Sequence, residues 1–226
     1  MPAAVEPSVG WGVLHLFCKV GLADAEGVTA AVKAAQADDV QVVPAAVLGH
    51  KADVAFMALA PDLWRLRALQ TELVAAGLDV IDSYVSLTEL SEYNPDPPEE
   101  LRNARLHPNL PPEGKPAFCF YPMSKRRGEV NNWFTLDHDA RKELMYAHGM
   151  SGRKFSGRVL QVVTGSTGID DFEWGVTLFA VHPDDLKEVV YTLRFDEASS
   201  LYAEFGPFYT GMVAPLAEVL AAVGVT

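Results

Sequence analysis

Cysteine is scarce in this sequence, with only Cys18 and Cys119 among 226 residues. Both lie inside apolar runs, HLFCKV and AFCFYP. We therefore expect two small buried hydrophobic side chains in a reducing compartment, and no disulfide framework. The sequence also lacks Cys-x-x-Cys and His-x-x-His spacings, which argues against the common zinc sites.

Positive charge is scarce as well, because 18 lysines and arginines accompany 30 aspartates and glutamates, for a formal net charge of −12. This balance argues against a nucleic-acid partner, which needs a broad basic surface to release phosphate counterions. The longest apolar run, MVAPLAEVLAAVG, is too short to span a bilayer and contains Glu218. The start, MPAAVEPSVGW, has no signal-peptide pattern. We expect a cytoplasmic protein that does not use a membrane.

The first half of the chain alternates short β-rich runs with helix-like segments. Strands are expected at 10–20, 40–49, 52–60 and 79–87, and helices at 24–37 and 61–77, the second opened by Pro61. Residues 92–116 are crowded with prolines and polar side chains. They predict a linker or a long ordered excursion.

The second half repeats the same order of elements. Strands are expected at 116–122, 157–166, 172–181 and around 205–211, and helices at 137–148, ended by Gly149, and 183–193. Two β-α-β-β-α-β units of the ferredoxin-like kind follow from this order. The predicted fold class is α+β, with two ferredoxin-like repeats whose sheets pair into one barrel-like body.

The segment FYPMSKRR at 120–127 places cations in an acidic chain. On a strand, Tyr121, Met123 and Lys125 share one face, while Pro122 suggests a strand edge or end. The strand period favours Lys125 and Arg127 over Arg126 as inward-facing cations. The simpler interpretation is a strand that finishes at the surface with its cations in water; the functional one is a pocket wall with a phenol, a thioether and a cation.

His148 ends a helical segment, DHDARKELMYAHG, in which Ala140, Leu144 and His148 share one face. A histidine in such a place is commonly a core residue or a helix cap. It can also be a metal ligand, as in many haem proteins with one axial histidine. No second histidine lies at ligand spacing, so a porphyrin iron fits better than a bare ion. No histidine lies beside a serine or cysteine in a nucleophile elbow, so a hydrolase triad has no support.

Longer motifs in the second half carry a resemblance to a known family. FYPMSKRR, NNWF, HGMSGRKFSGRVLQVVTGSTGIDDFEWGVTLFA and LRFDEASSLYAEFGPFYTG together resemble the chlorite dismutase-like superfamily. Within it they are similar to the coproheme decarboxylases of Gram-positive-type haem biosynthesis. The resemblance covers roughly residues 105–211, and the first half matches mainly in layout and in VSLTELSEY.

The resemblance implies a dimeric α+β barrel, usually assembled as a homopentamer. It divides the chain into an N-terminal half without cofactor, residues 1–104, which ends in the proline-rich connection, and a C-terminal half that binds the porphyrin, residues 105–226. It also implies transient contact with a coproporphyrin ferrochelatase.

The resemblance further implies roles for single residues. Tyr121 matches the tyrosine that becomes a radical, Lys125 the lysine near a propionate during the second decarboxylation, and His148 the proximal iron ligand. Gln161 matches the glutamine on the open distal side. Other binding positions are the propionate contacts Arg105, Arg194 and Ser199, and the pocket residues Met123 and Trp133. Arg105 is aligned across an apparent insertion in ARLHPNLPPEGKP, and Phe134 replaces a frequent tyrosine.

The implied reaction is the hydrogen peroxide-dependent oxidative decarboxylation of iron-coproporphyrin III (coproheme) at two propionates, which gives haem b. Coproheme is then both substrate and cofactor. Two alternatives stay open: a chlorite dismutase or peroxidase with permanent haem b, and a non-catalytic haem-binding protein. The resemblance disfavours the former, because chlorite-splitting relatives use a distal arginine where this chain has Gln161. A carrier gives no reason for the pairing of Tyr121 with Lys125.

Overall fold

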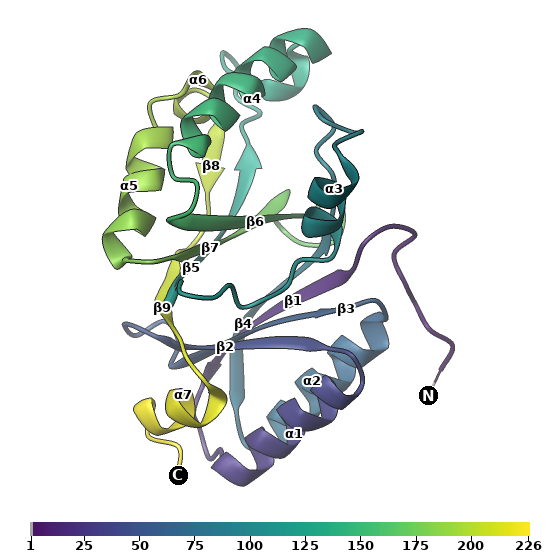
Figure 1. Ribbon diagram of the computed structural model, residues 1–226, viewed down its shortest axis with the longest axis vertical. Helices are drawn as coiled ribbons and strands as arrows, with labels where there is room; N and C mark the ends of the chain where they lie inside the picture. Colours follow the sequence, from purple (N-terminus) through teal and green to yellow (C-terminus); the bar gives the residue numbers. More distant parts are fainter. Residues whose placement is uncertain (1) are drawn as a thin grey trace.

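A computed structural model describes residues 2–226 (Figure 1). The first half runs in the order strand, helix, strand, strand, helix, strand. Its elements are β1 (Gly12–Lys19), α1 (Ala25–Ala37), β2 (Gln41–Val47), β3 (Val54–Ala60), α2 (Leu63–Ala75) and β4 (Asp79–Thr88). The expected elements of this half are all present.

The second half follows a connection that contains an additional helix, α3 (Glu99–Leu106), so residues 92–116 are an ordered excursion. It then has β5 (Ala117–Lys125), a 3₁₀ turn (Trp133–Thr135), α4 (His138–Arg153), β6 (Val159–Gly165), β7 (Trp174–Ala180), α5 (Pro183–Leu193), α6 (Glu197–Ser200), β8 (Ala203–Phe205), β9 (Tyr209–Val213) and α7 (Leu216–Ala222). The predicted boundary between 104 and 105 falls inside α3, and the division into halves at this point stays a prediction.

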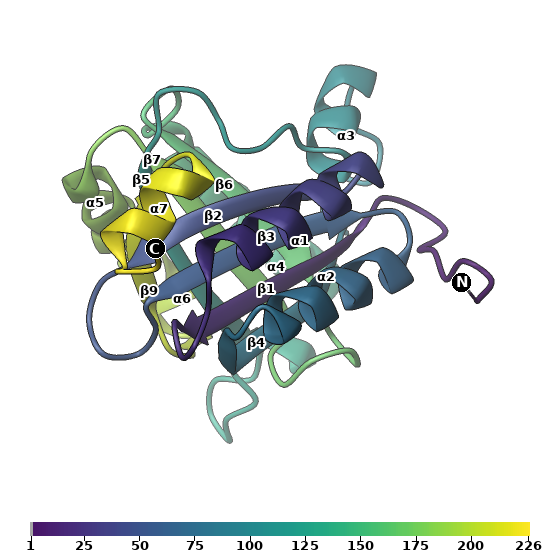
Figure 2. The same ribbon diagram turned by 90° about the horizontal axis from the view of Figure 1, so that it is seen from below.

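The strands form one sheet in the order β7-β6-β4-β1-β3-β2-β9-β5-β8. An additional β5–β7 pairing closes this sheet into a barrel, with β8 added alongside β5. Apolar side chains from both halves, among them Phe17, Met57, Phe118 and Phe179, fill its interior. Helices lie outside: α1, α2 and α7 cover the first half's strands at one end (Figure 2), and α4, α5 and α6 lie at the other. The predicted α+β fold of ferredoxin-like repeats is confirmed.

Two predicted helix boundaries were wrong. Pro61 does not open α2, because Asp62 caps it by accepting a hydrogen bond from the Trp64 N–H at 3.1 Å, so the helix begins at Leu63. Gly149 does not end α4, which continues to Arg153. A glycine inside a helix costs only about 1 kcal/mol relative to alanine, so tertiary contacts on both sides of it can outweigh the cost.

Two strand predictions were also wrong. Pro122 does not mark an edge, because β5 pairs with β7 on one side and with β8 and β9 on the other. The missing N–H falls where β8 and β9 are interrupted, beside the Gly206 N–H that donates to the Pro122 carbonyl. The closing strand at 205–211 is accordingly two short strands, β8 and β9.

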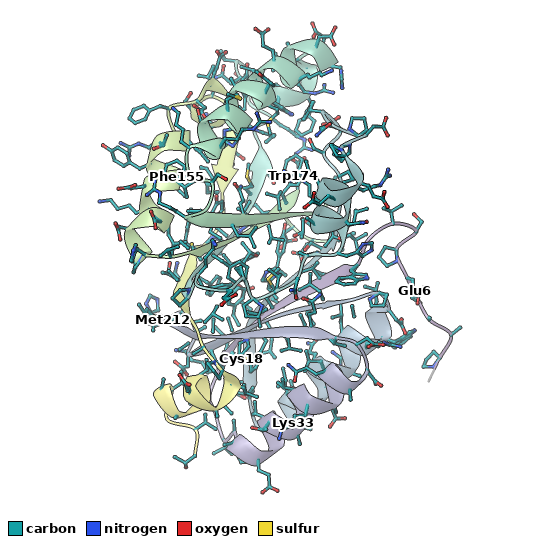
Figure 3. The ribbon with its side chains drawn as sticks, viewed as in Figure 1. Glu6, Cys18, Lys33, Phe155, Trp174 and Met212 are labelled. Carbon is teal, nitrogen blue, oxygen red and sulfur yellow. The ribbon has the colours of Figure 1, made fainter. Side chains whose placement is uncertain are left out.

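The helix layers of the two halves are packed differently. In the first half, buried residues of α1, α2 and α7, such as Val28, Leu73 and Leu220, join a continuous core against the sheet. Figure 3 shows Cys18 inside this half and Lys33 on the outer side of α1. In the second half, α5 is anchored by buried Leu186, Val189 and Leu193, whereas α4 has no buried residue. The side chains of α4 therefore do not complete a core of the first half's kind.

Both cysteines are free and buried, as expected from their apolar surroundings. No helix within residues 2–226 combines the length and apolar character needed to cross a membrane.

Candidate functional site

The predicted face of β5 is present and it lies against the helix layer. Tyr121 is 5% exposed and belongs to the core between the second half's sheet and α5, against which Met123 also packs. The Tyr121 ring stacks on Phe208 with centroids 4.5 Å apart, and Phe205 meets it edge-on at 5.6 Å. Burial, and then the nearby Cys119, raise the pKa of Tyr121, so its phenol is firmly protonated at neutral pH.

Lys125, at the end of the same strand, is a buried cation with 7% exposure. Its Nζ donates to the Ala198 carbonyl at 2.6 Å and lies 4.3 Å from the centroid of the Trp133 ring. Burial lowers the pKa of Lys125 to about 8, with a smaller opposing effect from Glu173. The ammonium is therefore held in place but close to its titration point.

The three consecutive cations have different partners. Arg126 Nε lies 3.4 Å from Glu204 Oε1, and Arg127 Nη2 lies 2.6 Å from Glu173 Oε1. Within residues 2–226, Lys125 has no carboxylate at ion-pair distance, so among these three consecutive cations it alone has a charge without an acidic partner. The expectation that Arg127 also faces inward was wrong: the strand ends at Lys125, and the Arg127 side chain is 59% exposed.

His148 lies on the half-buried face of α4 together with Ala140, Leu144 and Met145. Its Nδ1 is 3.2 Å from Asp196 Oδ2, an ion-pair distance without the geometry of an aligned hydrogen bond, and 3.5 Å from the Ser199 hydroxyl. Burial and the Lys125 charge lower the pKa of His148, and Asp196 opposes them. Because Nδ1 is directed at these groups, a neutral imidazole would offer Nε2 to a metal.

Asp196 is the functional candidate that sequence reasoning missed. Its Oδ1 accepts a hydrogen bond from the Ser151 hydroxyl at 2.9 Å, while Oδ2 faces His148. The carboxylate thus joins two turns of α4 to the chain before α6. Its position in RFDEASS, between Arg194 and Ser199, was a weak signal, because only tertiary packing brings it to His148.

Gln161 lies on the same face of the sheet as Tyr121. Across the three neighbouring strands β5, β7 and β6, Cys119, Leu178 and Gln161 lie directly opposite one another. Tyr121, Val176 and Val163 are opposite one another two residues further along, so both sets of side chains point to the same face. Its neighbours on β6, Val159 and Val163, pack into the apolar core, but Gln161 is exposed. An exposed amide on an otherwise apolar face suits a pocket wall.

The remaining predicted positions divide into two groups. Ser199 lies beside His148, and Trp133 is buried under the Lys125 ammonium. Arg105 is exposed on α3, and Arg194 lies over the exposed rings of Tyr191 and Phe195, 3.7 Å and 4.8 Å from their centroids. Within residues 2–226 neither guanidinium makes a hydrogen bond or ion pair, and the structure does not bring them into the His148–Lys125 cluster.

Within residues 2–226, the site has one histidine, His148, as a candidate metal ligand. Among the described residues, no group of three or more His, Cys, Asp or Glu side chains could hold a bare metal ion. A planar macrocycle that brings its own four nitrogens needs one protein ligand, apolar walls and cations for its acid groups. His148, the α4 face without buried residues, and Lys125 meet these needs.

Two hollows in the surface lie elsewhere. One of about 550 Å³ lies between α1 and α2, and one of about 200 Å³ is lined by residues that include Tyr84, Asp170 and Tyr209. Neither includes His148, Tyr121 or Lys125 in its lining.

The chain is similar in sequence and in fold to known proteins. Coproheme decarboxylase of Staphylococcus carnosus (strain TM300) is 45% identical over 179 residues, which cover 75% of this chain and 71% of that protein. The solved structure of a heme-binding protein from Thermus thermophilus matches with a TM-score of 0.86 and 35% identity, over 98% of this chain and 99% of the other.

The fold is shared more widely. A chlorite dismutase variant from Candidatus Nitrospira defluvii matches with a TM-score of 0.75 and 19% identity, over 96% of each chain. The family described as chlorite dismutase matches residues 22–214, which is most of the sequence. This chain is therefore a member of the chlorite dismutase family.

Proposed function

We propose that this protein is a coproheme decarboxylase, an oxidoreductase that converts iron-coproporphyrin III to haem b with hydrogen peroxide. The relative of that name supports the activity by its 45% identity. The observation that carries the proposal is the pairing on one face of β5 of a buried, protonated phenol, Tyr121, with Lys125, a buried ammonium that has no carboxylate partner. A haem carrier needs neither group.

In this proposal His148 holds the substrate iron through Nε2, while Asp196 and Ser199 fix the ring from the Nδ1 side. The bound iron, with peroxide, supplies the oxidising power. Gln161 lies on the peroxide side as a neutral amide, with no charge to hold an anionic oxidant such as chlorite.

Tyr121 is the group that would act on the propionate. Conversion of one propionate to a vinyl group releases one CO₂, one proton and two electrons, and one hydrogen peroxide accepts two electrons. The phenol, which is protonated at neutral pH, would give a hydrogen atom to the oxidant that peroxide supplies and become a radical. The radical would take a hydrogen atom from the propionate β-carbon, and the carbon-centred radical would lose CO₂ as its remaining electron passes to the same oxidant. The cycle runs twice, once for each propionate removed.

Charge placement would orient the four propionates. Lys125 makes a charge-assisted contact with one propionate during the second decarboxylation. Arg105, Arg194 and Ser199 contact others, with Met123 and Trp133 as pocket residues. Arg105 and Arg194 have guanidinium groups without competing protein partners in the described chain, which supports this use.

We also propose which half binds coproheme, how the subunits assemble and where in the cell the protein acts. Coproheme binds in residues 105–226, and residues 1–104 carry no cofactor. The protein acts in the cytoplasm as a homopentamer, and a coproporphyrin ferrochelatase contacts it transiently to deliver coproheme.

The decisive experiment compares Tyr121→Phe with Tyr202→Phe, a change at another buried tyrosine of the same half. Wild type and Tyr202→Phe should convert coproheme through a monovinyl intermediate to haem b, followed by mass. Tyr121→Phe should bind coproheme normally and leave its mass unchanged. Full turnover by Tyr121→Phe would refute the assignment, and rapid O₂ release from chlorite by wild type would favour the chlorite dismutase alternative.

A further inference from the structure

Glu173 is a buried carboxylate, 6% exposed, that comes immediately before β7. Its Oε2 accepts the backbone N–H of Lys125 at 2.8 Å, and its Oε1 accepts Arg127 Nη2 at 2.6 Å. Its own N–H donates to the Met123 carbonyl at 3.1 Å. Within residues 2–226, the hydrogen bonds of the Glu173 side chain therefore go to the last residue of β5, Lys125, and to Arg127 just beyond it.

The position of these contacts matters because the β5–β7 ladder stops there. Its last pair is Met123 with Trp174, so no strand residue of β7 remains to accept the Lys125 N–H. The Glu173 carboxylate takes the place of that missing backbone partner. An unmade hydrogen bond at a buried N–H would be costly.

The same carboxylate separates the cations. It binds Arg127 on the outer side, where this guanidinium also lies 4.1 Å from the Phe134 ring centroid. Lys125 is left to extend its side chain inward to the Ala198 carbonyl and the Trp133 ring. The Glu173 carboxylate thus holds both the backbone N–H of Lys125 and the guanidinium of Arg127.

We propose that Glu173 is a positioning residue for the propionate-binding Lys125: its carboxylate completes the end of β5 and so places the Lys125 ammonium for the second decarboxylation. This inference rests on the proposed function for its catalytic part. Glu173 itself touches neither substrate nor iron in this scheme.

The test has two readouts. In ligand-free protein, Glu173→Ala should speed amide hydrogen exchange at Lys125 by about tenfold or more, as expected for loss of a hydrogen bond to a charged group. With coproheme and peroxide, the variant should accumulate the intermediate that has lost one propionate, as Lys125→Ala should. Glu173→Gln keeps an acceptor oxygen and should restore most of the exchange protection and of the haem b yield.

Glu204→Ala is the matched control, because it removes the carboxylate partner of the adjacent cation, Arg126, without a contact to the Lys125 N–H. It should leave both the exchange rate at Lys125 and the product ratio at wild-type values. In a Lys125→Ala background, adding Glu173→Ala should change the ratio of haem b to the once-decarboxylated intermediate by less than about twofold. The second change should add little because Glu173 acts on the reaction through Lys125.

Two results would overturn the inference: wild-type exchange at Lys125 in Glu173→Ala, or an undiminished effect on products in the Lys125→Ala background. The exchange measurement needs no substrate. If wild type fails to decarboxylate coproheme while Glu173→Ala still exposes the Lys125 amide, the proposed function falls and the structural role of Glu173 stands.

Discussion

The two halves of this barrel repeat one order of elements but use their helix layers differently. In the first half, α1 and α2 each bury apolar residues in a continuous core with the sheet and α7. In the second, α5 is anchored in this way, but α4 buries none of its side chains and presents a half-buried face with Leu144, Met145 and His148.

The difference in helix packing between the two halves indicates which half has room for a ligand-binding site. A helix that completes a core stabilises the fold and leaves no room for a ligand. In α4, Leu144 and Met145 are only partly buried against a small cluster of Trp133, Ala198 and Tyr202, and His148 and Ser151 contact Asp196. This helix contributes less to the core, and under the proposed function its half-buried face would meet the macrocycle. The buried ammonium of Lys125 belongs to the same half, and burying a charge without a carboxylate partner costs stability. The proposed function gives a reason for it.

The largest expected effect tests the packing contrast directly. Leu73→Ala, at a fully buried position of α2, should lower the free energy of unfolding by about 3–5 kcal/mol. Leu144→Ala, on the half-buried face of α4, should lower it by about 1 kcal/mol or less in ligand-free protein, because little core is lost. Urea denaturation measures both. Equal losses would show that α4 is packed as firmly as α2.

The second prediction concerns His15, which joins the halves inside the barrel through a 2.9 Å contact of Nε2 with the Thr177 hydroxyl. Burial lowers the pKa of His15 from 6.5 to about 3. Between pH 6.5 and pH 3, His15 is protonated in the unfolded chain but stays neutral in the folded chain. The free energy of unfolding therefore has its full value above pH 6.5 and falls as the pH drops toward 3. The loss should be about 1.4 kcal/mol per pH unit.

His15→Gln should remove this contribution, so its free energy of unfolding should fall less steeply than that of wild type between pH 6 and pH 4. Thr177→Ser keeps the hydroxyl and should keep the wild-type slope. Denaturation midpoints at several pH values measure the effect, and parallel curves for His15→Gln and wild type would contradict the prediction.

A smaller effect is expected at Lys125. Its pKa is lowered to about 8 from 10.5, so below pH 8 the folded state bears the full cost of a buried charge, and the cost is relieved as pH rises through 8 toward 10.5. Lys125→Met should therefore raise the free energy of unfolding at pH 7, by about 1 kcal/mol after the lost contacts with Ala198 and Trp133 are subtracted. Coproheme binding should weaken.

Lys33→Met, at an exposed lysine of α1, is the control in the other half and should change stability by less than about 0.5 kcal/mol. A destabilised Lys125→Met would mean that the ammonium is structural, and the contrast between the halves would lose one of its supports.

The smallest effect is expected for the exposed arginines. Arg194→Ala and Arg105→Ala should leave stability unchanged within about 0.5 kcal/mol and raise the Kd for coproheme about twofold to fivefold, less at high salt. Arg67→Ala, at an exposed arginine of α2, should leave the Kd unchanged. Identical affinities for Arg194→Ala and Arg67→Ala would remove Arg194 from the site.

Local pattern was enough for much of the fold. The helix at 183–193 was predicted at both bounds, and the strands emerged from short apolar runs bounded by turns. The shared face of Tyr121, Met123 and Lys125 followed from the period of a strand. The same period gave the wrong side for Arg127, because it stops applying where β5 ends at Lys125.

Other features depended on partners distant in the sequence. Gly149 looked like a helix stop, yet contacts to Asp196 from His148 on one side and Ser151 on the other accompany a helix that continues through it. Pro122 looked like an edge residue, yet its missing donor falls at the interruption between β8 and β9. Neither could be foreseen from neighbours along the chain.

The sequence by itself determined the order of the strands and main helices in the two repeats, the family, and which side chains of β5 share a face, because these follow from period, turns and long motifs. It did not indicate the short helices α3, α6 and α7 or the interruption between β8 and β9. Tertiary structure alone decided that Asp196 faces His148, that Glu173 fixes the end of β5, and that Lys125 keeps a charge without a carboxylate partner. The physical reason is that an ion pair or a buried hydrogen bond depends on distance in space, and closing the barrel sets those distances.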